Sequence, residues 1–374
     1  MSAATRSKRI WQLDASRGLI MVLMALDHAN HFIAQRHSSG EYWGGPLPVY
    51  PNTLAFVTRL VTHLCAPGFF FLMGTGIELF ADRRRRRGWS EGAVTAHFLL
   101  RGALLIGLQF LVVNRAWELS PGGWAPEIYA GVLFALGGAM MVVGGLLRRL
   151  PTWTLVGITL VLFLATELLT PDPSLWQRAL PAVRRLLFLP GGGERLWVTY
   201  PLVPWISFVL AGTIFGRWLR RDEAAAFSRA LSLGAGFLLA FLVVRAGNGF
   251  GNIRPRESDS WIDFLNVVKY PPSVSFALLT LGADLLLLGL LARLTGREGP
   301  LLQPLRAIGR VPLFFYVTHL FLYALLGRAL TPNGTSISHM FGYWLLGLAM
   351  LYPACRWYGR VKRRSPRSPV LRLV

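Results

Sequence analysis

The chain is poor in cysteine, in acidic residues and in charged residues altogether. Charged residues make up 15% of the 374 positions, whereas soluble proteins carry about 25%. The two cysteines, Cys65 and Cys355, both fall in predicted helices and offer no disulfide framework. No small-residue cleavage site follows the first apolar run, so we expect no cleavable signal peptide.

Long apolar runs are what the chain has in excess. Hydrophobic residues make up 53% of the sequence, and the mean hydropathy is +0.45. A helix needs about 20 apolar residues to cross a bilayer. Ten such runs lie at residues 13–35, 53–81, 95–114, 128–147, 153–170, 197–217, 227–245, 271–292, 311–327 and 339–356. The sequence therefore predicts an all-α protein, a polytopic transmembrane bundle of about ten helices.

The formal net charge of +21 is spread in short clusters of Lys and Arg between these runs. Such clusters are typical of cytoplasmic loops, and no aromatic-interleaved basic groove for nucleic acid is present. With the N-terminus inside, 25 of the 39 basic residues fall on the inner side, 11 on the outer side and three within the runs. Both termini are therefore predicted to be cytoplasmic. The run Arg83–Arg87 is interpreted as an anchor on anionic lipids rather than a specific phosphate site.

We expect a single integral-membrane domain over residues 1–374, with basic cytoplasmic tails at 1–12 and 357–374. The longest predicted outer connections are residues 171–196 and 246–270, which contain glycine, proline and aromatic residues. Long loops of this kind often bind ligands, and a solvated loop with a short interfacial helix is the alternative.

Among the histidines inside apolar runs, three stand out as functional candidates, because an ionisable side chain deep in such a run is costly. His28 lies beyond the middle of the first run, His63 in the outer part of the second, and His319 near the middle of the ninth. Since a helix rises about 1.5 Å per residue, these side chains can reach similar depths. We predict that they line one cavity in the outer half of the bilayer; the alternative is that each only hydrogen-bonds across helices.

Asp27 directly precedes His28, so the two side chains point about 100° apart on a helix. Asp27 is therefore predicted to orient His63 or His319 as a catalytic partner, because a carboxylate that accepts an imidazole N–H makes the other nitrogen a better base. His28 and His31, at i and i+3, keep a metal site open as an alternative. The sequence has no HExxH motif and no paired cysteines, and we expect no metal.

Basic residues at both predicted surfaces complete the candidate site. Arg17 and Arg101 are predicted to face the phosphates of a cytoplasmic cosubstrate as fixed cations. An ion pair of Arg17 with Asp14, or snorkelling to lipid headgroups, is the alternative. Lys269 and Tyr270 precede two prolines and are expected at the outer mouth, over the histidines.

Six stretches follow one another in an order and spacing that resembles a known family. They are LDASRG, LMALDH, THLCAPGFFFLMGTG, YPLVPWISFVLAGTIFGRWL, FLNVVKYPPS and GRVPLFFYVTHL. From Leu13 to about Arg364, the chain resembles the heparan-alpha-glucosaminide N-acetyltransferase-like family, and in particular its bacterial membrane branch.

The resemblance implies a transmembrane acyl-transfer fold in the bacterial cytoplasmic (inner) membrane, and it makes a homodimer reasonable. Better known relatives take acetyl from cytoplasmic acetyl-CoA and place it on a sugar amine on the far side. The family's polar active-site position falls on His28, and its catalytic histidine falls near His37, two residues short of the family spacing. We therefore assign catalysis to His28 and His63, together with Asp27 and His319, and keep His37 as a substrate contact.

The sequence thus predicts an acyltransferase that moves an acetyl or other acyl group from acyl-CoA to an amine or hydroxyl of an outer carbohydrate. Lys269, Tyr270 and Trp261 are predicted to contact this acceptor, and an interfacial aromatic belt is the alternative for the two aromatic residues. A secondary transporter or flippase of a polar or lipid-linked solute would use similar buried polar residues and broken helices. A non-catalytic membrane anchor or assembly factor fits poorly with three buried histidines.

Overall fold

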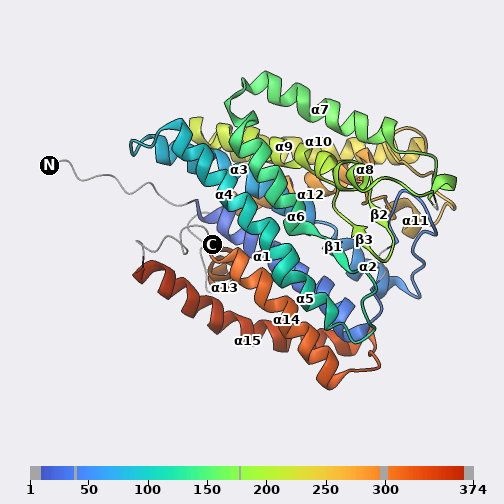
Figure 1. Ribbon diagram of the computed structural model, residues 1–374. Coiled ribbons are helices and arrows are strands. Elements are labelled where there is room, and N and C mark those ends of the chain that lie inside the picture. The colour runs from blue at the N-terminus through green and yellow to red at the C-terminus, as the bar shows by residue number, and fades with distance from the viewer. Residues whose placement is uncertain (1–9, 38–39, 177, 295–301, 366–374) are drawn as a thin grey trace.

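The computed structural model describes residues 10–37, 40–176, 178–294 and 302–365, and these residues form one bundle of helices (Figure 1). The main helices are α1 (Trp11–Ala29), α2 (Thr53–Thr62), α3 (Cys65–Arg85), α4 (Glu91–Leu108), α6 (Val132–Ala139), α7 (Thr152–Leu169), α9 (Leu202–Arg221), α10 (Glu223–Gly247), α12 (Val274–Arg293), α14 (Pro312–Leu330) and α15 (Ile337–Arg364). The short helices are α5 (Asn114–Glu118), α8 (Ala182–Leu187), α11 (Trp261–Leu265) and α13 (Leu302–Gly309).

The bundle has two chemically different ends. Helix α1 begins and α15 ends at the same end, beside the turn between α3 and α4 (Figure 1). That turn carries Arg83–Arg87, and we call this the basic end. The predicted C-terminal tail from residue 357 starts as helix, because α15 continues to Arg364. Residues 1–9 and 366–374 of the two predicted tails lie outside the described residues.

Eight helical stretches of the described chain are long and apolar enough to cross a membrane, so the predicted all-α membrane bundle is confirmed. They are Thr53–Arg85, Glu91–Glu118, Val132–Arg149, Thr152–Leu169, Leu202–Arg221, Glu223–Gly247, Val274–Arg293 and Pro312–Leu330. The other two predicted runs form α1 and α15, which are long helices but are not among the eight. Helix α1 carries Asp14, Arg17 and Asp27, which lower its mean hydropathy.

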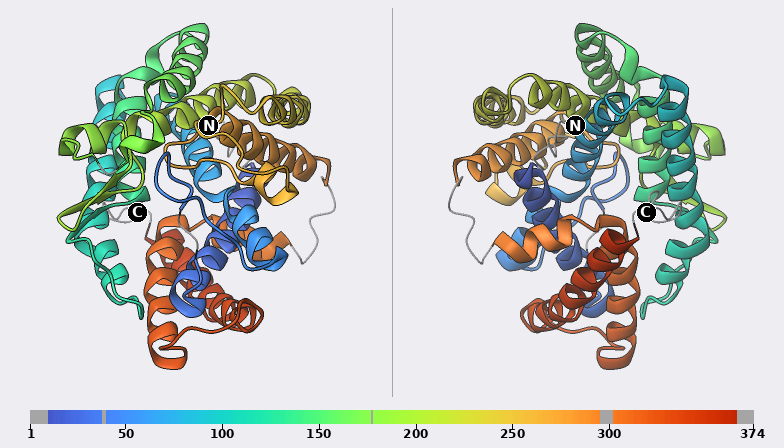
Figure 2. Two further views of the ribbon diagram at one scale, coloured as in Figure 1. Left: turned by 90° about the vertical axis from the view of Figure 1, so that its right-hand side faces the viewer. Right: turned by 90° about the vertical axis from the view of Figure 1, so that its left-hand side faces the viewer.

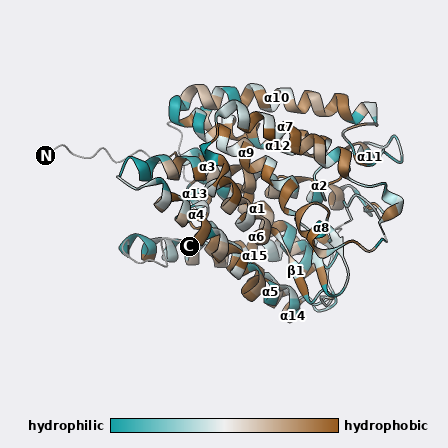
Figure 3. Cartoon of the chain, turned by 45° about the horizontal axis from the view of Figure 1, so that its top comes forward, coloured by the Kyte–Doolittle hydropathy of each residue, from teal (hydrophilic) through white to brown (hydrophobic). Residues whose placement is uncertain are grey.

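Helix α1 can hold these polar groups because it lies inside the protein. It packs against α3, α12, α13, α14 and α15, and Figure 2 shows it enclosed between the C-terminal helices and the rest of the bundle. Helices α7 and α10 lie on the outside instead, since only 17% and 22% of their apolar windows are buried, against 72% for α9. Figure 3 shows apolar residues along both outer helices, which would face lipid.

Small residues allow α3 and α9 to pack closely. A side chain at Gly74 would collide with the carbonyl of Val209, and one at Gly212 would collide with that of Phe71. The Thr75 hydroxyl donates a hydrogen bond to the Gly212 carbonyl at 3.0 Å. The small-residue pair at Gly212 and Gly216 therefore serves packing within the chain, as in other membrane helix pairs.

A small sheet covers the end opposite the basic end (Figure 1), and the sequence did not predict it. Its strands are β1 (Ile128–Ala130), β2 (Gly191–Gly192) and β3 (Leu196–Val198), in the order β1-β3-β2. Strands β1 and β3 are parallel, with Tyr129 opposite Trp197. The predicted fourth run therefore begins as a strand at residue 128 and becomes helical only at Val132.

Three π-helical segments interrupt helices near the centre of the bundle: η1 (Asn30–Ala34), η2 (Gln109–Val113) and η3 (Met140–Gly144). Such segments occur frequently at functional sites, because they redirect the side chains around them. Segment η1 contains His31, and η2 leads into α5, which contains Trp117; both side chains line a cavity.

Candidate active site in two adjoining cavities

Two cavities lie within the bundle. One has a volume of about 310 Å³ and the other of about 440 Å³. The first, which we call the basic cavity, has apolar walls and four cationic residues: Arg17, Arg101, Arg310 and Lys362. The second, which we call the aromatic cavity, is lined by Asp27, His28, His31, His37, Lys269 and many aromatic residues, among them Tyr42, Trp117, Trp124, Tyr129, Trp197, Tyr200, Tyr270 and Tyr316.

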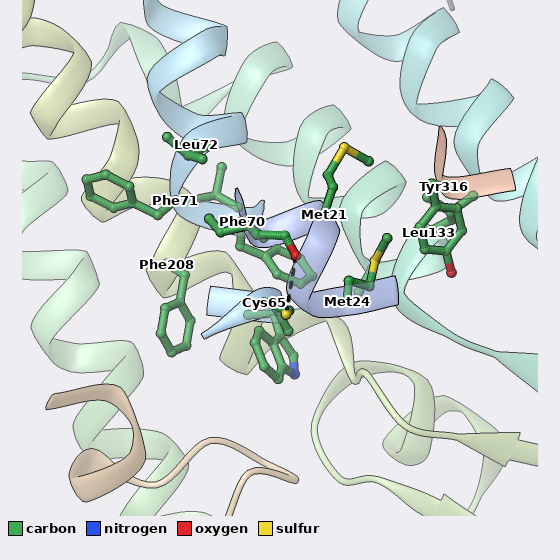
Figure 4. Close-up of a cluster of buried hydrophobic side chains, with 14 of the residues drawn as sticks. Met21, Met24, Cys65, Phe70, Phe71, Leu72, Leu133, Phe208 and Tyr316 are labelled. Carbon is green, nitrogen blue, oxygen red and sulfur yellow. Dashed lines mark hydrogen bonds between the residues drawn. The ribbon is translucent and has the colours of Figure 1, made fainter. Parts of the chain in front are cut away.

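The two cavities adjoin each other. Phe69, Val132 and Tyr316 line both of them, and we call these three residues the partition. On α1, Met21 lines the basic cavity and Met24 lines the aromatic cavity one turn further along. Figure 4 shows both methionines and Tyr316 in this central region. The two cavities therefore meet at the partition, with the cationic residues lining one cavity and the histidines the other.

His28 and His319 form a direct pair at the aromatic cavity. Nδ1 of His28 lies 2.7 Å from Nε2 of His319. Nδ1 of His319 lies 2.9 Å from the Phe315 carbonyl oxygen, which can only accept a hydrogen bond. When both rings are neutral, Nδ1 of His319 therefore carries its proton, its Nε2 accepts from His28, and Nε2 of His28 keeps a lone pair. This Nε2 has no hydrogen-bond partner among the described residues.

Asp27 does not orient His63 or His319, so that prediction is wrong. Its Oδ1 accepts hydrogen bonds from Arg59 at 2.8 Å and from the Thr62 hydroxyl at 2.7 Å. Helix geometry explains the difference, because Asp27 points about 100° away from the His28–His319 pair and faces α2 instead.

Arg59 links two carboxylates. It binds Glu41 with two hydrogen bonds, 2.6 Å from Nε to Oε1 and 2.8 Å to Oε2, in addition to its bond to Asp27. Glu41 is 0% exposed and Arg59 is 2% exposed. Burial alone would raise the pKa of Glu41, but the Arg59 charge and hydrogen bonds outweigh it and lower the pKa to about 2. This charge-assisted cluster fixes the wall of the aromatic cavity.

The remaining histidines take different places. His37 lies in the aromatic cavity, with Nε2 2.8 Å from Arg59 and 3.1 Å from Asp27. Nε2 of His37 thus lies between a guanidinium, which only donates, and a carboxylate, which only accepts. It accepts from Arg59 when it is unprotonated and donates to Asp27 when it carries the proton. His63 is 2% exposed, does not line either cavity, and has Nε2 3.8 Å from Glu41. The predicted single cavity lined by His28, His63 and His319 is therefore not formed.

The predicted acceptor contacts separate into two groups. Lys269 and Tyr270 line the aromatic cavity, with Nζ of Lys269 5.1 Å from the Tyr270 ring centre. Burial, followed by the Arg59 charge, lowers the pKa of Lys269 to about 8. Trp261 lies outside both cavities, is 50% exposed and packs its ring on Phe56 at 5.2 Å. Its predicted sugar contact stays a prediction that no cavity supports.

The structure brings Arg17 and Arg101 to one cavity wall, as expected if both face the same anionic ligand. Arg17 contacts Asp14 at 3.4 Å, so the predicted ion pair is present. Arg101 makes neither a hydrogen bond nor an ion pair with any described residue, and its Nε is buried without a partner. A buried guanidinium without an acceptor is costly, and an anionic ligand in the cavity would satisfy it.

Sequence reasoning missed several residues of the site. Arg59 carries a signal that could have found it, since a lone arginine in an apolar run needs a buried carboxylate. Glu41 is that carboxylate, but it lies in a loop whose path the sequence did not predict. Glu167 also has partners that sequence pattern could not show: its carboxylate accepts from the backbone N–H groups of Gly251 and Ile253 at 3.0 and 2.6 Å.

In the described ranges, no group of three or more His, Cys, Asp or Glu residues is arranged to hold a metal ion.

Comparison with known proteins identifies the family. A family model described as heparan-alpha-glucosaminide N-acetyltransferase, catalytic, matches residues 9–245. The Mus musculus heparan-alpha-glucosaminide N-acetyltransferase is 30% identical over 137 residues, which cover 37% of this chain and 19% of the relative. The Homo sapiens protein of the same name is 28% identical over 135 residues, covering 36% of this chain and 18% of the relative.

The matched part of the chain thus spans about a fifth of the length of these relatives. The family match is much longer and includes the helices that carry Arg17, His28, Arg59 and Arg101. Lys269, Tyr316 and His319 lie beyond it. With more than half of its residues in that one match, the chain belongs to the heparan-alpha-glucosaminide N-acetyltransferase catalytic family.

Proposed function

We propose that this integral membrane protein transfers an acetyl group from acetyl-CoA, bound in the basic cavity, to an amine or hydroxyl of a carbohydrate in the aromatic cavity. The observation that carries the proposal is the partition: two cavities of different chemistry, one lined by cationic and apolar residues and one by aromatic residues and histidines, share Phe69, Val132 and Tyr316. The basic end would face the cytoplasm of a bacterial cell, in its inner membrane, because basic residues concentrate on the cytoplasmic side.

The basic cavity suits the donor substrate. Arg101 offers an unpartnered guanidinium, and Arg17, Arg310 and Lys362 add cations on the same wall. Phosphate groups are the anions that several converging guanidinium and ammonium groups recognise. The remaining walls are methionine, leucine and phenylalanine side chains, which would enclose the thioester arm and lead it to the partition.

The aromatic cavity suits a neutral or weakly polar acceptor. Its many Trp and Tyr side chains present ring faces and hydroxyl groups, which stack on sugar rings and hydrogen-bond their hydroxyls. His28 borders this space, and its free Nε2 would remove the proton of the attacking amine or hydroxyl. His319 fixes the tautomer and ring orientation that keep this lone pair available. Asp27, Arg59 and Glu41 hold the opposite wall in place.

Binding and turnover test the proposal together. Purified protein in detergent is titrated calorimetrically with acetyl-CoA, with free CoA as competitor, and transfer of labelled acetyl to glucosamine is measured separately. Micromolar binding that CoA competes, together with acetylated product, supports the transferase. Folded protein that binds no acetyl-CoA contradicts it.

A transporter with the same two cavities would behave differently. In vesicles it would exchange a labelled solute for its unlabelled form with no acetylation, and acetyl-CoA would have no effect on the exchange. That outcome would replace the transferase with the transporter.

A further inference from the structure

Lys269 is held rigidly at the wall of the aromatic cavity. Its backbone N–H and that of Tyr270 both donate to the Glu41 carbonyl oxygen, at 2.9 and 3.0 Å, and the Trp43 N–H donates to the Tyr270 carbonyl at 2.8 Å. Lys269 as a whole is only 2% exposed, yet it borders the cavity. Backbone hydrogen bonds therefore hold this segment in place, and the Lys269 side chain is not needed to anchor it.

The ammonium group has no acceptor among the residues that the structure describes. None of them forms a hydrogen bond or an ion pair with Nζ of Lys269, which lies 5.1 Å from the centre of the Tyr270 ring. Arg59 already occupies both nearby carboxylates, Asp27 and Glu41. An ammonium carries three N–H donors, and leaving them unpaired in a buried site is costly. A ligand in the cavity is the remaining source of an acceptor.

The local charge balance indicates what kind of acceptor this is. Lys269 and Arg59 supply two positive charges, and Asp27 and Glu41 supply two negative charges, so the cluster is neutral as it stands. A permanently anionic ligand would leave an excess negative charge in a poorly solvated site. A neutral carbonyl would leave the site neutral. During the reaction its oxygen gains negative charge while His28 gains a proton, so the total charge of the site stays constant.

We propose that the Lys269 ammonium donates a hydrogen bond to the thioester carbonyl oxygen and stabilises the negative charge that develops on it during acyl transfer. This inference rests on the transferase function proposed above. It adds a catalytic residue from a segment beyond residues 9–245, the part of the chain that the family model matches. Donors placed in advance where charge develops are commonly the largest single contribution to such reactions.

The acyl group would pass directly from the sulfur of the thioester to the acceptor. The acceptor nitrogen or oxygen forms a bond to the thioester carbon, and its proton passes to Nε2 of His28. The carbonyl π pair moves onto oxygen, beside Lys269. When the carbonyl re-forms, the carbon–sulfur bond breaks, and the sulfur leaves with the electron pair and receives the proton held by His28. Lys269 donates a hydrogen bond throughout and gives up no proton.

Two substitutions at this position test the proposal. In Lys269→Met, kcat for transfer to glucosamine and kcat for hydrolysis of acetyl-CoA by water should both fall about 10²–10³-fold, as when other oxyanion donors are removed. The calorimetric affinity for acetyl-CoA should change by less than about threefold, since Lys269 does not line the basic cavity. Lys269→Arg, which keeps a cationic donor, should recover part of the rate. Arg115→Met, on an exposed ion pair with Glu118, is the control.

Each outcome decides something. If Lys269→Met keeps wild-type kcat, the inference is wrong while the transferase stands. If only the KM for the acceptor rises and hydrolysis is unchanged, Lys269 binds the acceptor and not the oxyanion, which also overturns the inference. If wild-type protein neither binds acetyl-CoA nor transfers acetyl, the transferase proposal itself fails.

The pH dependence of kcat distinguishes a catalytic role of Lys269 from a purely structural one. The charged and titratable groups that interact with Lys269 come from several elements: Asp27 and His28 from α1, Glu41 and Tyr270 from the loops, Arg59 from α2, His63 directly after α2, and Cys65 from α3. With the pKa of Lys269 lowered to about 8, wild-type kcat should decline as the ammonium is lost above that pH. Lys269→Arg should remove this alkaline decline, because a guanidinium stays protonated there. An unchanged decline in Lys269→Arg contradicts the assignment.

Discussion

Nδ1 of His28, on α1, lies 2.7 Å from Nε2 of His319, on α14, although the two residues are 291 positions apart in sequence. Since Nδ1–H of neutral His319 donates to the Phe315 carbonyl at 2.9 Å, Nε2 of His319 accepts from Nδ1–H of His28, and Nε2 of His28 keeps a lone pair. A histidine whose tautomer is fixed by a partner is a prepared general base.

His28→Ala should therefore lower kcat for acetyl transfer by about 10²–10⁴-fold, the usual contribution of a general base. His319→Phe should lower kcat less, because the base remains but its tautomer is no longer fixed. His339→Ala, at an exposed position, is the matched control and should keep wild-type rates. A fully active His28→Ala protein would remove His28 from the mechanism.

His63→Ala separates the two histidines that sequence reasoning treated alike. His63 is buried outside both cavities, 3.8 Å from Glu41, so we expect a lower melting temperature and a kcat within about tenfold of wild type. The measurement is transfer rate alongside thermal unfolding in detergent. Loss of transfer comparable to His28→Ala, with an intact melting temperature, would restore His63 as the catalytic residue.

Arg101→Ala should weaken the binding of both acetyl-CoA and free CoA, because it removes a cation whose partner would come from the ligand. An expected loss of about 2–3 kcal/mol corresponds to roughly 30–150-fold in Kd, as for other hydrogen-bonded charges. Calorimetric titration at two salt concentrations is the test. Equal affinity in wild type and Arg101→Ala would place the phosphates elsewhere.

The Arg59 cluster should control stability. Arg59→Met leaves the buried Glu41 and the partly buried Asp27 without their partner, and we expect a loss of about 3–5 kcal/mol, seen as a lower melting temperature. Arg86→Met, whose ion pair with Asp82 is mostly exposed, should cost about 0–1 kcal/mol. Similar melting temperatures for the two variants would show that the buried cluster contributes little.

The lowered pKa of Glu41 predicts that the folded protein loses stability at acidic pH. Its pKa is lowered from an ordinary value near 4.5 to about 2 in the folded protein. A lowered carboxyl pKa contributes stability that is fully present above pH 4.5 and is lost as the pH falls through about 2. Wild type should therefore lose more stability than Glu41→Gln between pH 5 and pH 2, when both are followed by thermal unfolding. Parallel pH profiles would show that Glu41 does not titrate with unfolding.

The helices and the buried ionisable residues were predictable, because an apolar run of membrane length, and a charged residue within it, can be recognised in a single sequence. Both Arg17 and Arg101 were found in this way and line one cavity. The pairing of side chains was not predictable. Asp27 was expected to orient His63 or His319 and instead contacts Arg59 and His37, because helix rotation decides which neighbour a side chain meets.

Loop residues were the least accessible to sequence reasoning. Glu41 lies at the centre of the buried cluster, yet nothing in its local pattern shows that the loop folds back over α2. The parallel pairing of β1 with β3 joins residues about 68 positions apart, and no local periodicity records such a contact. By contrast, two prolines mark the end of the loop that carries Lys269 and Tyr270, and both residues line the aromatic cavity, although they are buried there.

The central claim is that acetyl crosses the partition from one side of the membrane to the other, and vesicles with separated substrates test it most directly. Proteoliposomes are loaded with glucosamine, and labelled acetyl-CoA is added only outside. The account predicts acetylated glucosamine inside the vesicles, and none when Val132→Trp fills the space shared by the two cavities. Product that forms only when both substrates are on the same side would contradict the claim.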